Sequence, residues 1–417
     1  MKNILIFTAS YPYGSGETYL EAEIEYLSQV SNVTVVPLGV KDEARKHREL
    51  PPSVKLLLLK NNNKLQKIKA VLKSVCSKAV FFGVLELVRC GKLSATTIKE
   101  LAKFIYAGES HYQKVISMVK ANGILLNEDL IAYSYWMDSS SYMVSKLGEK
   151  GCISCSRTHG GDLYDERTPW KHQFLRKYIV EHLDFLCPIS FMGKEYLERR
   201  IGKHDNIVPM HLGIQDEGAG IEPDHDGMTF VSCSAVIPLK RIDLIVEALS
   251  KINQKNVCWV HFGEGPELEA MKKLAGDKLT NICFEFRGQV SNAGLKAYYK
   301  TKPIKAFINA SETEGVPVSI MEAMSFGIPA IATDVGGVGE LVQNEVNGIL
   351  VPANSSDALL SGMMRILSMS DTEYAAMRQR ARNAFLNQWE YKNNYGKFYR
   401  LISESRKEEK AWQVKKI

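Results

Sequence analysis

The chain has 417 residues, more than the roughly 250–300 residues at which a single hydrophobic core usually stops growing, so we expect two domains. Hydrophobic residues make up 45% and charged residues 24% of the chain, which excludes a disordered, collagen-like or small disulfide-stabilised protein. A formal net charge of +6 is small for this length, and we expect no nucleic-acid partner.

Membrane-spanning and secreted classes are also disfavoured. No apolar run approaches the roughly 20 residues that span a bilayer. The first residues, MKNILIFTASYP, predict a buried strand rather than a secretion signal. The eight cysteines lack the spacing of a disulfide framework, and the CxxC pair Cys152 and Cys155 is expected to supply two strand residues rather than a metal or redox site. A reducing cytoplasm is the expected location.

Short β-branched segments alternate with helical patterns along the chain, which is typical of parallel sheets covered by helices. In the first half the predicted strands are 4–7, 33–37, 131–134 and 185–189, with a further strand leading to Arg157. In the second half they are 229–233, 258–262, 283–287, 306–309 and 330–333. This alternation predicts two doubly wound α/β domains.

The segment 213–227, GIQDEGAGIEPDHDG, is rich in Gly, Pro and acidic residues and predicts a linker. The first domain is then expected at 1–212 and the second at about 226–388. The remaining segment, 389–417, has aromatic residues at helical spacing and predicts a helix that packs on a surface. Two alternatives remain open: the helix packs on its own domain, or it crosses back to the first.

The strongest functional signal lies between Ser311 and Val342. A predicted strand leads into a polar loop, and a helix begins near Pro317 and ends near Gly327. Free N–H groups at such a helix start, together with the helix dipole, attract phosphate. The candidate phosphate-binding or donor-binding residues of this helix start are Gly315, Val316, Pro317 and Val318.

Two carboxylates frame this helix start, Glu314 in the loop and Glu322 one turn into the helix. Because carboxylates repel phosphate, their expected partners are neutral hydroxyls such as those of a ribose or a sugar. Glu314 alone could be an ordinary helix-capping acid, but the combination with Glu322 and the following turn at Gly336 and Gly337 favours a binding site.

Two further segments of the second domain carry candidate residues. Lys240 and Arg241 follow a predicted strand, where they could contact a diphosphate or form an ordinary solvated surface. The turn FGEGP places Gly263 and Gly265 after another strand, where the backbone could approach a nucleotide.

This set of motifs resembles the retaining glycosyltransferases of family 4, in particular Glu314 and Glu322 with seven residues between them, the GVP after Glu314 and the later GG turn. The resemblance implies the GT-B architecture, with two Rossmann-like domains facing a central cleft. It implies that Glu322 holds the nucleotide ribose and that Glu314 and nearby amides contact the donor sugar. It assigns the leaving diphosphate to Lys240 and Arg241, although the family's usual Arg is replaced here by Ala235.

The first domain contributes two loops. The turn Gly14-Ser15-Gly16 follows the first strand and could form an anion-binding nest. The resemblance implies that this loop closes over donor and acceptor, with Gly16 on the donor side and Gly14, Ser15, Glu17 and Thr18 on the acceptor side. It also implies that His159, in the loop SRTHGGDLYDER, faces the donor sugar and is catalytic, whereas a lone histidine is more often structural.

The implied reaction moves a sugar from a nucleotide diphosphate sugar to an acceptor hydroxyl with retention of anomeric configuration. No metal-binding motif stands out, so we expect a metal-independent enzyme with no cofactor beyond the donor substrate. The expected acceptor is a lipid-linked or growing glycan of a bacterial capsule, O-antigen or exopolysaccharide. The alternatives are a sugar-nucleotide epimerase of the same fold and a non-catalytic partner subunit.

The charge is unevenly distributed. Residues 41–120 hold 17 Lys and Arg against 6 Asp and Glu, so this stretch carries +11 and the other 337 residues carry −5. We predict a helical insert at about 41–125. Its apolar residues recur at three- and four-residue steps and predict one helical stripe, with lysines beside or opposite it. The residues of this stripe are Leu65, Ile68, Leu72, Val75, Ala79 and Phe82. The helix either packs on the first domain with a solvated basic face, or attaches the protein to anionic lipid at the inner face of the membrane.

Overall fold

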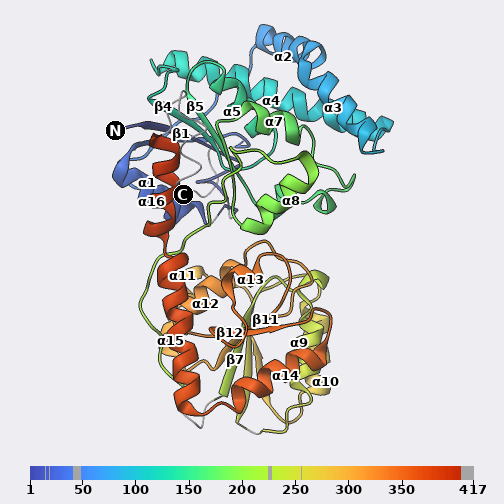
Figure 1. Ribbon diagram of the computed structural model, residues 1–417, viewed down its shortest axis with the longest axis vertical. Coiled ribbons are helices and arrows are strands. Elements are labelled where there is room, and N and C mark those ends of the chain that lie inside the picture. Colours follow the sequence, from blue (N-terminus) through green and yellow to red (C-terminus); the bar gives the residue numbers. More distant parts are fainter. Residues whose placement is uncertain (15, 18, 41–47, 224–227, 255, 405–417) are drawn as a thin grey trace. The chain divides into compact units, whose positions relative to one another are not determined.

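The computed structural model describes residues 1–14, 16–17, 19–40, 48–223, 228–254 and 256–404. The chain divides into two compact units (Figure 1). The first unit comprises Met1–Gly213 and the segment that begins at Asn394, and the second comprises Ile214–Asn393. Ser15, Thr18, the end of the predicted linker at 224–227 and the basic C-terminal end at 405–417 lie outside the described residues.

The first unit is built on a six-stranded parallel sheet with the order β3-β2-β1-β4-β5-β6. Nearly every residue of its central strands is buried, as expected for a sheet with helices on both faces. The strands are β1 (Asn3–Thr8), β2 (Asn32–Pro37), β3 (Lys55–Leu56), β4 (Leu130–Ser134), β5 (Ile153–Thr158) and β6 (Phe185–Pro188).

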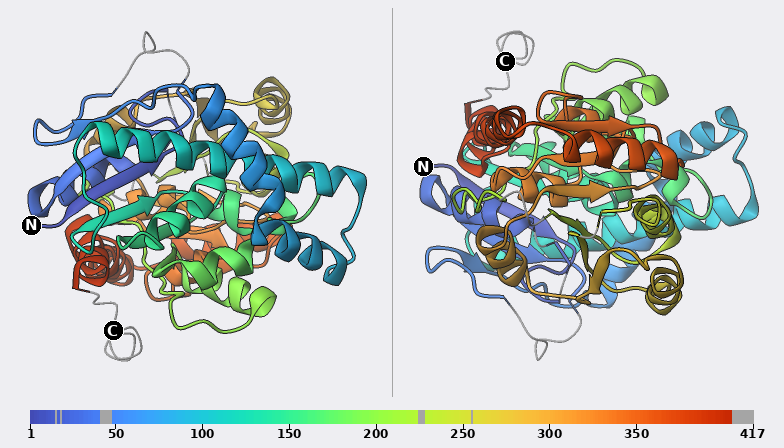
Figure 2. Two further views of the ribbon diagram at one scale, coloured as in Figure 1. Left: turned by 90° about the horizontal axis from the view of Figure 1, so that it is seen from above. Right: turned by 90° about the horizontal axis from the view of Figure 1, so that it is seen from below.

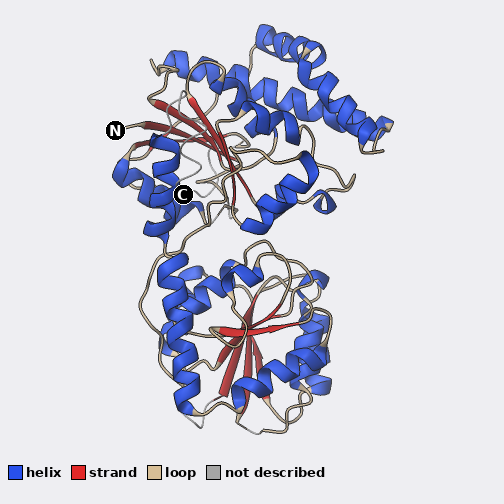
Figure 3. Ribbon diagram, viewed as in Figure 1, coloured by secondary structure: helices blue, strands red, loops and turns tan. Residues whose placement is uncertain are grey.

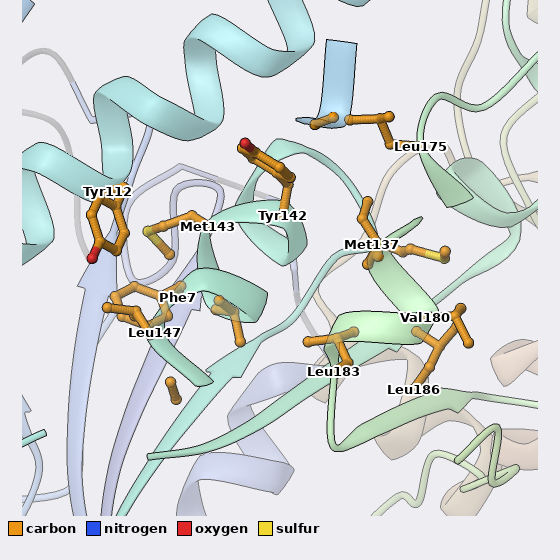
Figure 4. Close-up of a cluster of buried hydrophobic side chains, with 14 of the residues drawn as sticks. Phe7, Tyr112, Met137, Tyr142, Met143, Leu147, Leu175, Val180, Leu183 and Leu186 are labelled. Carbon is orange, nitrogen blue, oxygen red and sulfur yellow. The ribbon is translucent and has the colours of Figure 1, made fainter. Parts of the chain in front are cut away.

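Helices enclose this sheet (Figure 3). The helices of the first unit are α1 (Leu20–Val30), α2 (Lys64–Cys76), α3 (Lys78–Arg89), α4 (Ala95–Ala121), α5 (Ser139–Gly148), α6 (Gly160–Leu163), α7 (Arg176–His182), α8 (Phe191–Ile201) and α16 (Tyr391–Glu404). One core cluster lies between the sheet and the helices α4, α5 and α7, where Phe7 meets Tyr112, Met143 and Leu147 (Figure 4).

The second unit repeats the plan, with a six-stranded parallel sheet ordered β12-β11-β10-β7-β8-β9. Its strands are β7 (Met228–Cys233), β8 (Val257–Phe262), β9 (Cys283–Phe286), β10 (Ala306–Asn309), β11 (Ala330–Thr333) and β12 (Gly348–Val351). Its helices are α9 (Ile242–Leu249), α10 (Leu268–Lys278), α11 (Asn292–Thr301), α12 (Val318–Ser325), α13 (Val338–Leu341), α14 (Ser356–Leu367) and α15 (Asp371–Gln388).

Counted from the start of each unit, both sheets have the strand order 3-2-1-4-5-6 of a doubly wound Rossmann-like fold. The predicted pair of Rossmann-like domains is therefore confirmed. In such a sheet, ligands bind beyond the carboxyl ends of the strands where the strand order reverses. That switch point lies between β1 and β4 in the first unit and between β7 and β10 in the second.

The C-terminal helix answers the question that the sequence left open, because from Asn394 onward it packs on the first unit. The Tyr395 hydroxyl donates to the Gly213 carbonyl over 3.0 Å, and the Tyr399 hydroxyl donates to the Val30 carbonyl over 3.0 Å. Phe398 is fully buried, with its ring centroid 5.2 Å from that of Tyr133. The crossing back to the first domain is confirmed.

The single amphipathic helix predicted for the basic segment is wrong. The backbone is extended at Ser77, which divides the segment into α2 and α3 and places Ala79 and Phe82 on the second of these. Figure 2 shows α2 and α3 lying along α4. The apolar stripe is not buried in α2, where Leu65, Leu72 and Val75 are exposed.

Two local features of the second unit were not predicted. Strand β12 (Gly348–Val351) was missed. Cys258 and Cys283 are register partners on β8 and β9 and are joined by a disulfide with a Cα–Cα distance of 4.6 Å. The scattered cysteine spacing gave no indication of that pairing.

Candidate functional site

The switch point of the second unit is spanned by an ion pair. Lys240 ends a short 3₁₀ turn (Pro238–Lys240) after β7, and Glu314 lies in the loop after β10. The Lys240 Nζ donates to Glu314 Oε1 over 2.5 Å. A backbone hydrogen bond of 3.0 Å from the Glu312 N–H to the Leu239 carbonyl fixes the two loops to each other. The structure therefore brings these two predicted residues together.

Glu314 is held from two further directions. The Ser311 hydroxyl donates to Glu314 Oε1 over 2.6 Å, and Asn309 Nδ2 donates to the same oxygen over 3.3 Å. None of the described residues donates to Oε2. The carboxylate is thus fixed through Oε1, and Oε2 is available to accept a hydrogen bond from a ligand hydroxyl.

The glycines of this region are required by close packing of loops. A Cβ at Gly336 would lie 1.9 Å from the Glu314 carbonyl oxygen, and the Gly337 N–H donates to the Gly315 carbonyl over 2.7 Å. Gly263 and Gly265 meet the loop after β7 in the same way, since their Cβ atoms would lie 1.8 Å and 2.3 Å from backbone oxygens. The GG and GEGP turns therefore shape the loops that carry Lys240 and Glu314.

Helix α12 begins directly after this loop. Pro317 precedes its first residue with an extended backbone, so the helix starts within one residue of the predicted position. The first N–H groups of a helix have no partner within it, which leaves the N–H groups of Val318 and Ser319 without an intrahelical acceptor. The side chains of Val316 and Val318 are buried, whereas Gly315 is partly exposed.

Glu322 lies on α12 and is buried, with 8% of its surface exposed. Its Oε1 accepts from Asn292 Nδ2 on α11 over 2.6 Å. Burial raises the pKa of the Glu322 carboxyl, while the bond from Asn292 and the charge of Lys296 oppose that shift. Asn292 was not predicted, because an asparagine at a helix start is common and carries no specific signal.

Arg241 does not join Lys240. Its backbone is left-handed, with φ at +49°, and its guanidinium forms a fork with Asp243 at 3.1 and 2.9 Å. It also donates to Glu312 over 3.0 Å and to Asn354. The Arg241 guanidinium is therefore bound by residues of the chain itself. Its predicted role with the diphosphate stays a prediction without geometric support.

The switch point of the first unit is built around Glu17. Its carboxylate accepts from the backbone N–H groups of Ala9, Ser10 and Tyr11 at 2.7–2.8 Å and from Trp136 Nε1 at 2.8 Å. The N–H groups of Ala9, Ser10 and Tyr11, directly after β1, therefore already donate to a carboxylate of the chain itself. The anion-binding nest predicted at Gly14-Ser15-Gly16 stays a prediction, since Ser15 lies outside the described residues. Gly14 and Gly16 are exposed, and their ligand roles stay predictions.

His159 is packed against two neighbouring aromatic rings. The ring centroids of Tyr135 and Trp136 each lie 4.6 Å from that of the imidazole. Burial, with a smaller effect of the Arg157 charge, lowers the pKa of His159 to about 3, so the ring is neutral at physiological pH. Neither ring nitrogen has a hydrogen-bond partner within the described ranges. Trp136 also bonds Glu17, so the structure connects the two predicted loops of this unit.

Asp162 positions this loop and was missed as a candidate. Its carboxylate accepts from the Met137 N–H over 2.6 Å, the His159 N–H over 2.5 Å and the Thr158 hydroxyl over 3.1 Å. Burial raises the pKa of Asp162 to about 7, against the lowering effect of these bonds. The acid three residues after His159, at the start of α6, was the available sequence signal.

Arg157 is the second missed residue. It is fully buried and pairs with Glu23 over 3.2 Å, and its Nε donates to the Tyr133 hydroxyl over 2.9 Å. Its guanidinium carbon lies 4.3 Å from the ring centroid of Phe398 on the C-terminal helix. This network ties β5, just before His159, to α1 and α16.

The described residues contain neither a membrane-spanning helix nor a cluster of metal-binding side chains. No helix among them is long and apolar enough to cross a bilayer. The same residues contain no group of three or more His, Cys, Asp or Glu side chains placed to hold a metal ion.

Comparison with known proteins agrees with this geometry. A family model described as glycosyl transferases group 1 matches residues 216–384, which include Lys240, Glu314 and Glu322. This part of the chain, which makes up most of the second unit, is similar to that glycosyltransferase family. The match ends before the C-terminal helix and leaves the first unit uncovered.

Two curated relatives are named as glycosyltransferases. The chain is 26% identical over 220 residues to the amylovoran biosynthesis glycosyltransferase AmsK of Erwinia amylovora, covering 50% of this chain and 53% of AmsK. It is 25% identical over 257 residues to the putative colanic acid biosynthesis glycosyltransferase WcaL of Escherichia coli (strain K12), covering 57% of this chain and 62% of WcaL. The chain thus matches between half and two thirds of the length of these relatives.

Among solved structures, HepE of Anabaena in complex with UDP-glucose is similar with a TM-score of 0.66 and 12% identity, covering 97% of this chain and 100% of HepE. At this identity the likeness shows the fold, which is GT-B. The GT-B fold predicted from the sequence is confirmed, and the predicted family agrees with the family match over residues 216–384.

Proposed function

We propose that the protein is a retaining glycosyltransferase that moves a sugar from a nucleotide diphosphate sugar to an acceptor hydroxyl. The observation that carries this proposal is the Lys240–Glu314 pair at the switch point of the second unit, beside the start of α12. It combines a cation and free N–H groups for a diphosphate with a carboxylate for hydroxyl groups.

Each residue of this site has a proposed task. Lys240 neutralises charge that develops on the leaving diphosphate, and the N–H groups at the start of α12 do the same from a fixed position. The Glu314 carboxylate keeps Lys240 in place and accepts from sugar hydroxyls through Oε2. Glu322, oriented by Asn292, accepts from the nucleotide ribose.

The proposed chemistry is front-side attack by the acceptor hydroxyl. The bond between the anomeric carbon and the diphosphate oxygen breaks, the bond to the acceptor oxygen forms on the same face, and the leaving phosphate takes the acceptor proton. Lys240 and the α12 amides supply the stabilisation without a metal in this scheme, and transfer should persist in EDTA. A sugar trapped covalently on the enzyme would contradict it.

We assign the donor to the UDP-sugars, because a structure of the same fold, HepE, was solved with UDP-glucose. We assign the acceptor to a lipid-linked or growing glycan of a surface polysaccharide, because the relatives AmsK and WcaL are named for amylovoran and colanic acid biosynthesis. The reaction would then take place in the cytoplasm, at the inner face of the cell membrane. His159 is assigned to the donor sugar and Gly14, Ser15, Glu17 and Thr18 to the acceptor.

The test is a panel of UDP-, GDP- and other nucleotide sugars, with release of nucleoside diphosphate as the readout and a bacterial lipid extract as the acceptor source. We expect one donor to give extract-dependent release and a product that keeps the anomeric configuration. A Glu322→Ala variant should lose this activity, whereas Glu269→Ala, which removes an exposed acid on α10, should keep it.

Two outcomes would overturn the assignment. Unchanged transfer by Glu322→Ala would show that the donor site is elsewhere. Conversion of the sugar nucleotide without an acceptor into an isomeric sugar would identify an epimerase.

A further inference from the structure

The basic segment of the first unit has a surface that neither proposed site uses. Between Glu49 and Glu86 the sequence holds seven lysines and no acidic residue. Helix α2 lies in the middle of this stretch and carries four of them, Lys64, Lys67, Lys69 and Lys73. All four are exposed, and none forms an ion pair with any residue that the structure describes.

The contacts of α2 with α4 fix which side of the helix faces inward. Gln66 Nε2 donates to the Ser117 hydroxyl over 2.6 Å, and Asn62 Nδ2, just before the helix, donates to the Ser110 carbonyl over 3.1 Å. Ala70 is fully buried on the same side. The inward side of α2 is therefore small and polar, the reverse of a helix that packs on a core.

The apolar residues of α2 lie on the opposite side. At 100° per residue they fill an arc of about 120° that is centred away from Gln66 and Ala70. Their exposed fractions are large, and together they define what we call the α2 face: Leu65 69%, Ile68 54%, Val71 49%, Leu72 59% and Val75 68%. A contiguous exposed apolar surface of this kind marks an interaction site.

The lysines border this face. By the same helical spacing, Lys67 lies about 40° beyond one edge of the arc and Lys69 about 40° beyond the other, while Lys64, in the first turn, lies within the arc. A lysine at such an edge can keep its alkyl stem on apolar material while its ammonium group reaches sideways to an anion. Exposed apolar residues continue into α3, where Phe81 is 69% exposed.

We propose that the α2 face binds the surface of an anionic lipid bilayer. The apolar arc would enter the boundary between head groups and acyl chains, and the lysines on its two edges would contact lipid phosphates. A helix of 13 residues is about 20 Å long and is not apolar on all sides, so it lies in the plane of the membrane. Lysines on both edges, with no acid among them, complement an anionic surface.

Flotation of the full-length protein with vesicles tests this directly. We expect binding to phosphatidylcholine vesicles that contain about one third phosphatidylglycerol, weakening with added salt, and little binding to pure phosphatidylcholine. Reversing Lys64, Lys67 and Lys69 to Glu should weaken binding by about 100-fold or more. Leu65→Gln with Leu72→Gln should weaken it by about 10- to 100-fold, since both side chains are already exposed and carry no core packing.

A matched control reverses three exposed lysines on α10 in the second unit and should leave vesicle binding unchanged: Lys272, Lys273 and Lys278. Equal loss in this control, or no binding by the wild-type protein, would overturn the proposal. A dimer in sedimentation that Leu65→Gln with Leu72→Gln abolishes, without vesicle binding, would assign the face to a second copy instead. Nucleotide binding in the absence of vesicles should be the same in all variants, which separates this proposal from the proposed transfer.

Discussion

The two units have the same strand order, yet their switch points contain different chemistry. In the second unit, a lysine after the first strand pairs with a carboxylate after the fourth, and the helix start beside them has free N–H groups. In the first unit, the carboxylate of Glu17 lies at the corresponding place and already accepts from three backbone N–H groups and from Trp136.

The two units thus share a fold but differ in their capacity to bind a diphosphate. The first unit satisfies its switch-point donors internally, so an added anion would have to displace a carboxylate. The second unit keeps a cation and unpaired amides at the same position. We therefore expect binding of the donor's phosphates to depend on the second unit, whereas the corresponding region of the first unit contains a neutral histidine packed against two aromatic rings.

The largest expected effect is that of Lys240→Ala. Loss of the cation that faces the developing negative charge should lower kcat by about 100- to 1,000-fold. Steady-state rates of nucleoside diphosphate release would measure it. Lys302→Ala, which removes an exposed lysine at the end of α11, should change the rate less than twofold, and a similar loss in both variants would argue against a specific role.

Glu322→Gln comes next. The amide keeps an oxygen for Asn292 but replaces a charged acceptor for the ribose with a neutral group, so the Kd of the nucleoside diphosphate should rise by about 10- to 100-fold. Isothermal titration calorimetry would measure this change. An unchanged Kd would remove Glu322 from the donor site.

Glu17→Ala probes the first unit. It strips an acceptor from three N–H groups and an indole, and we expect the free energy of unfolding to fall by about 1–2 kcal/mol with nucleotide affinity unchanged within about twofold. Denaturant unfolding and calorimetry on the same preparation give both values. Glu21→Ala, which removes a surface ion pair with Arg48, should cost less than about 1 kcal/mol. Strong loss of nucleotide binding in Glu17→Ala alone would break the comparison between the two switch points.

The smallest expected effect is a pH dependence from Asp162. Burial raises its pKa to about 7, above the ordinary value of 3.8. Between these values the folded chain retains a proton that the unfolded chain releases, so the contribution of Asp162 to stability falls as the pH rises from about 4 to about 7. The Tm of Asp162→Asn should therefore fall less than the Tm of the wild type as the pH rises between these two values. Identical slopes would show that Asp162 is ionised in the folded chain throughout.

Much of the second unit could be predicted from the sequence. Its strands are short β-branched runs, and its functional residues lie in compact blocks where glycine and proline mark each loop. The packing of Gly336 against Glu314 shows why such a block can be recognised in the sequence. A close backbone contact requires a glycine at one position, and that glycine is visible in the sequence.

The first unit was less readable for a physical reason. Arg157, Glu23 and Phe398 form one network from three distant parts of the chain, and no local pattern indicates that they meet. In α2, the periodicity of the apolar residues was detected correctly, but a period does not tell whether the apolar side faces a core or solvent. The inward contacts of Gln66 and Ala70 decided that orientation.

The most direct test of the account is hydrogen–deuterium exchange of the full-length protein with and without saturating nucleoside diphosphate, taken from the panel of UDP, GDP and other nucleotides. With nucleoside diphosphate bound, we expect slower exchange in the segments that contain Lys240 and the Glu314–Glu322 block. Exchange after β1, around Ala9 and Ser10, should be unchanged. Protection confined to the loop after β1, or absent with every nucleotide, would contradict the account.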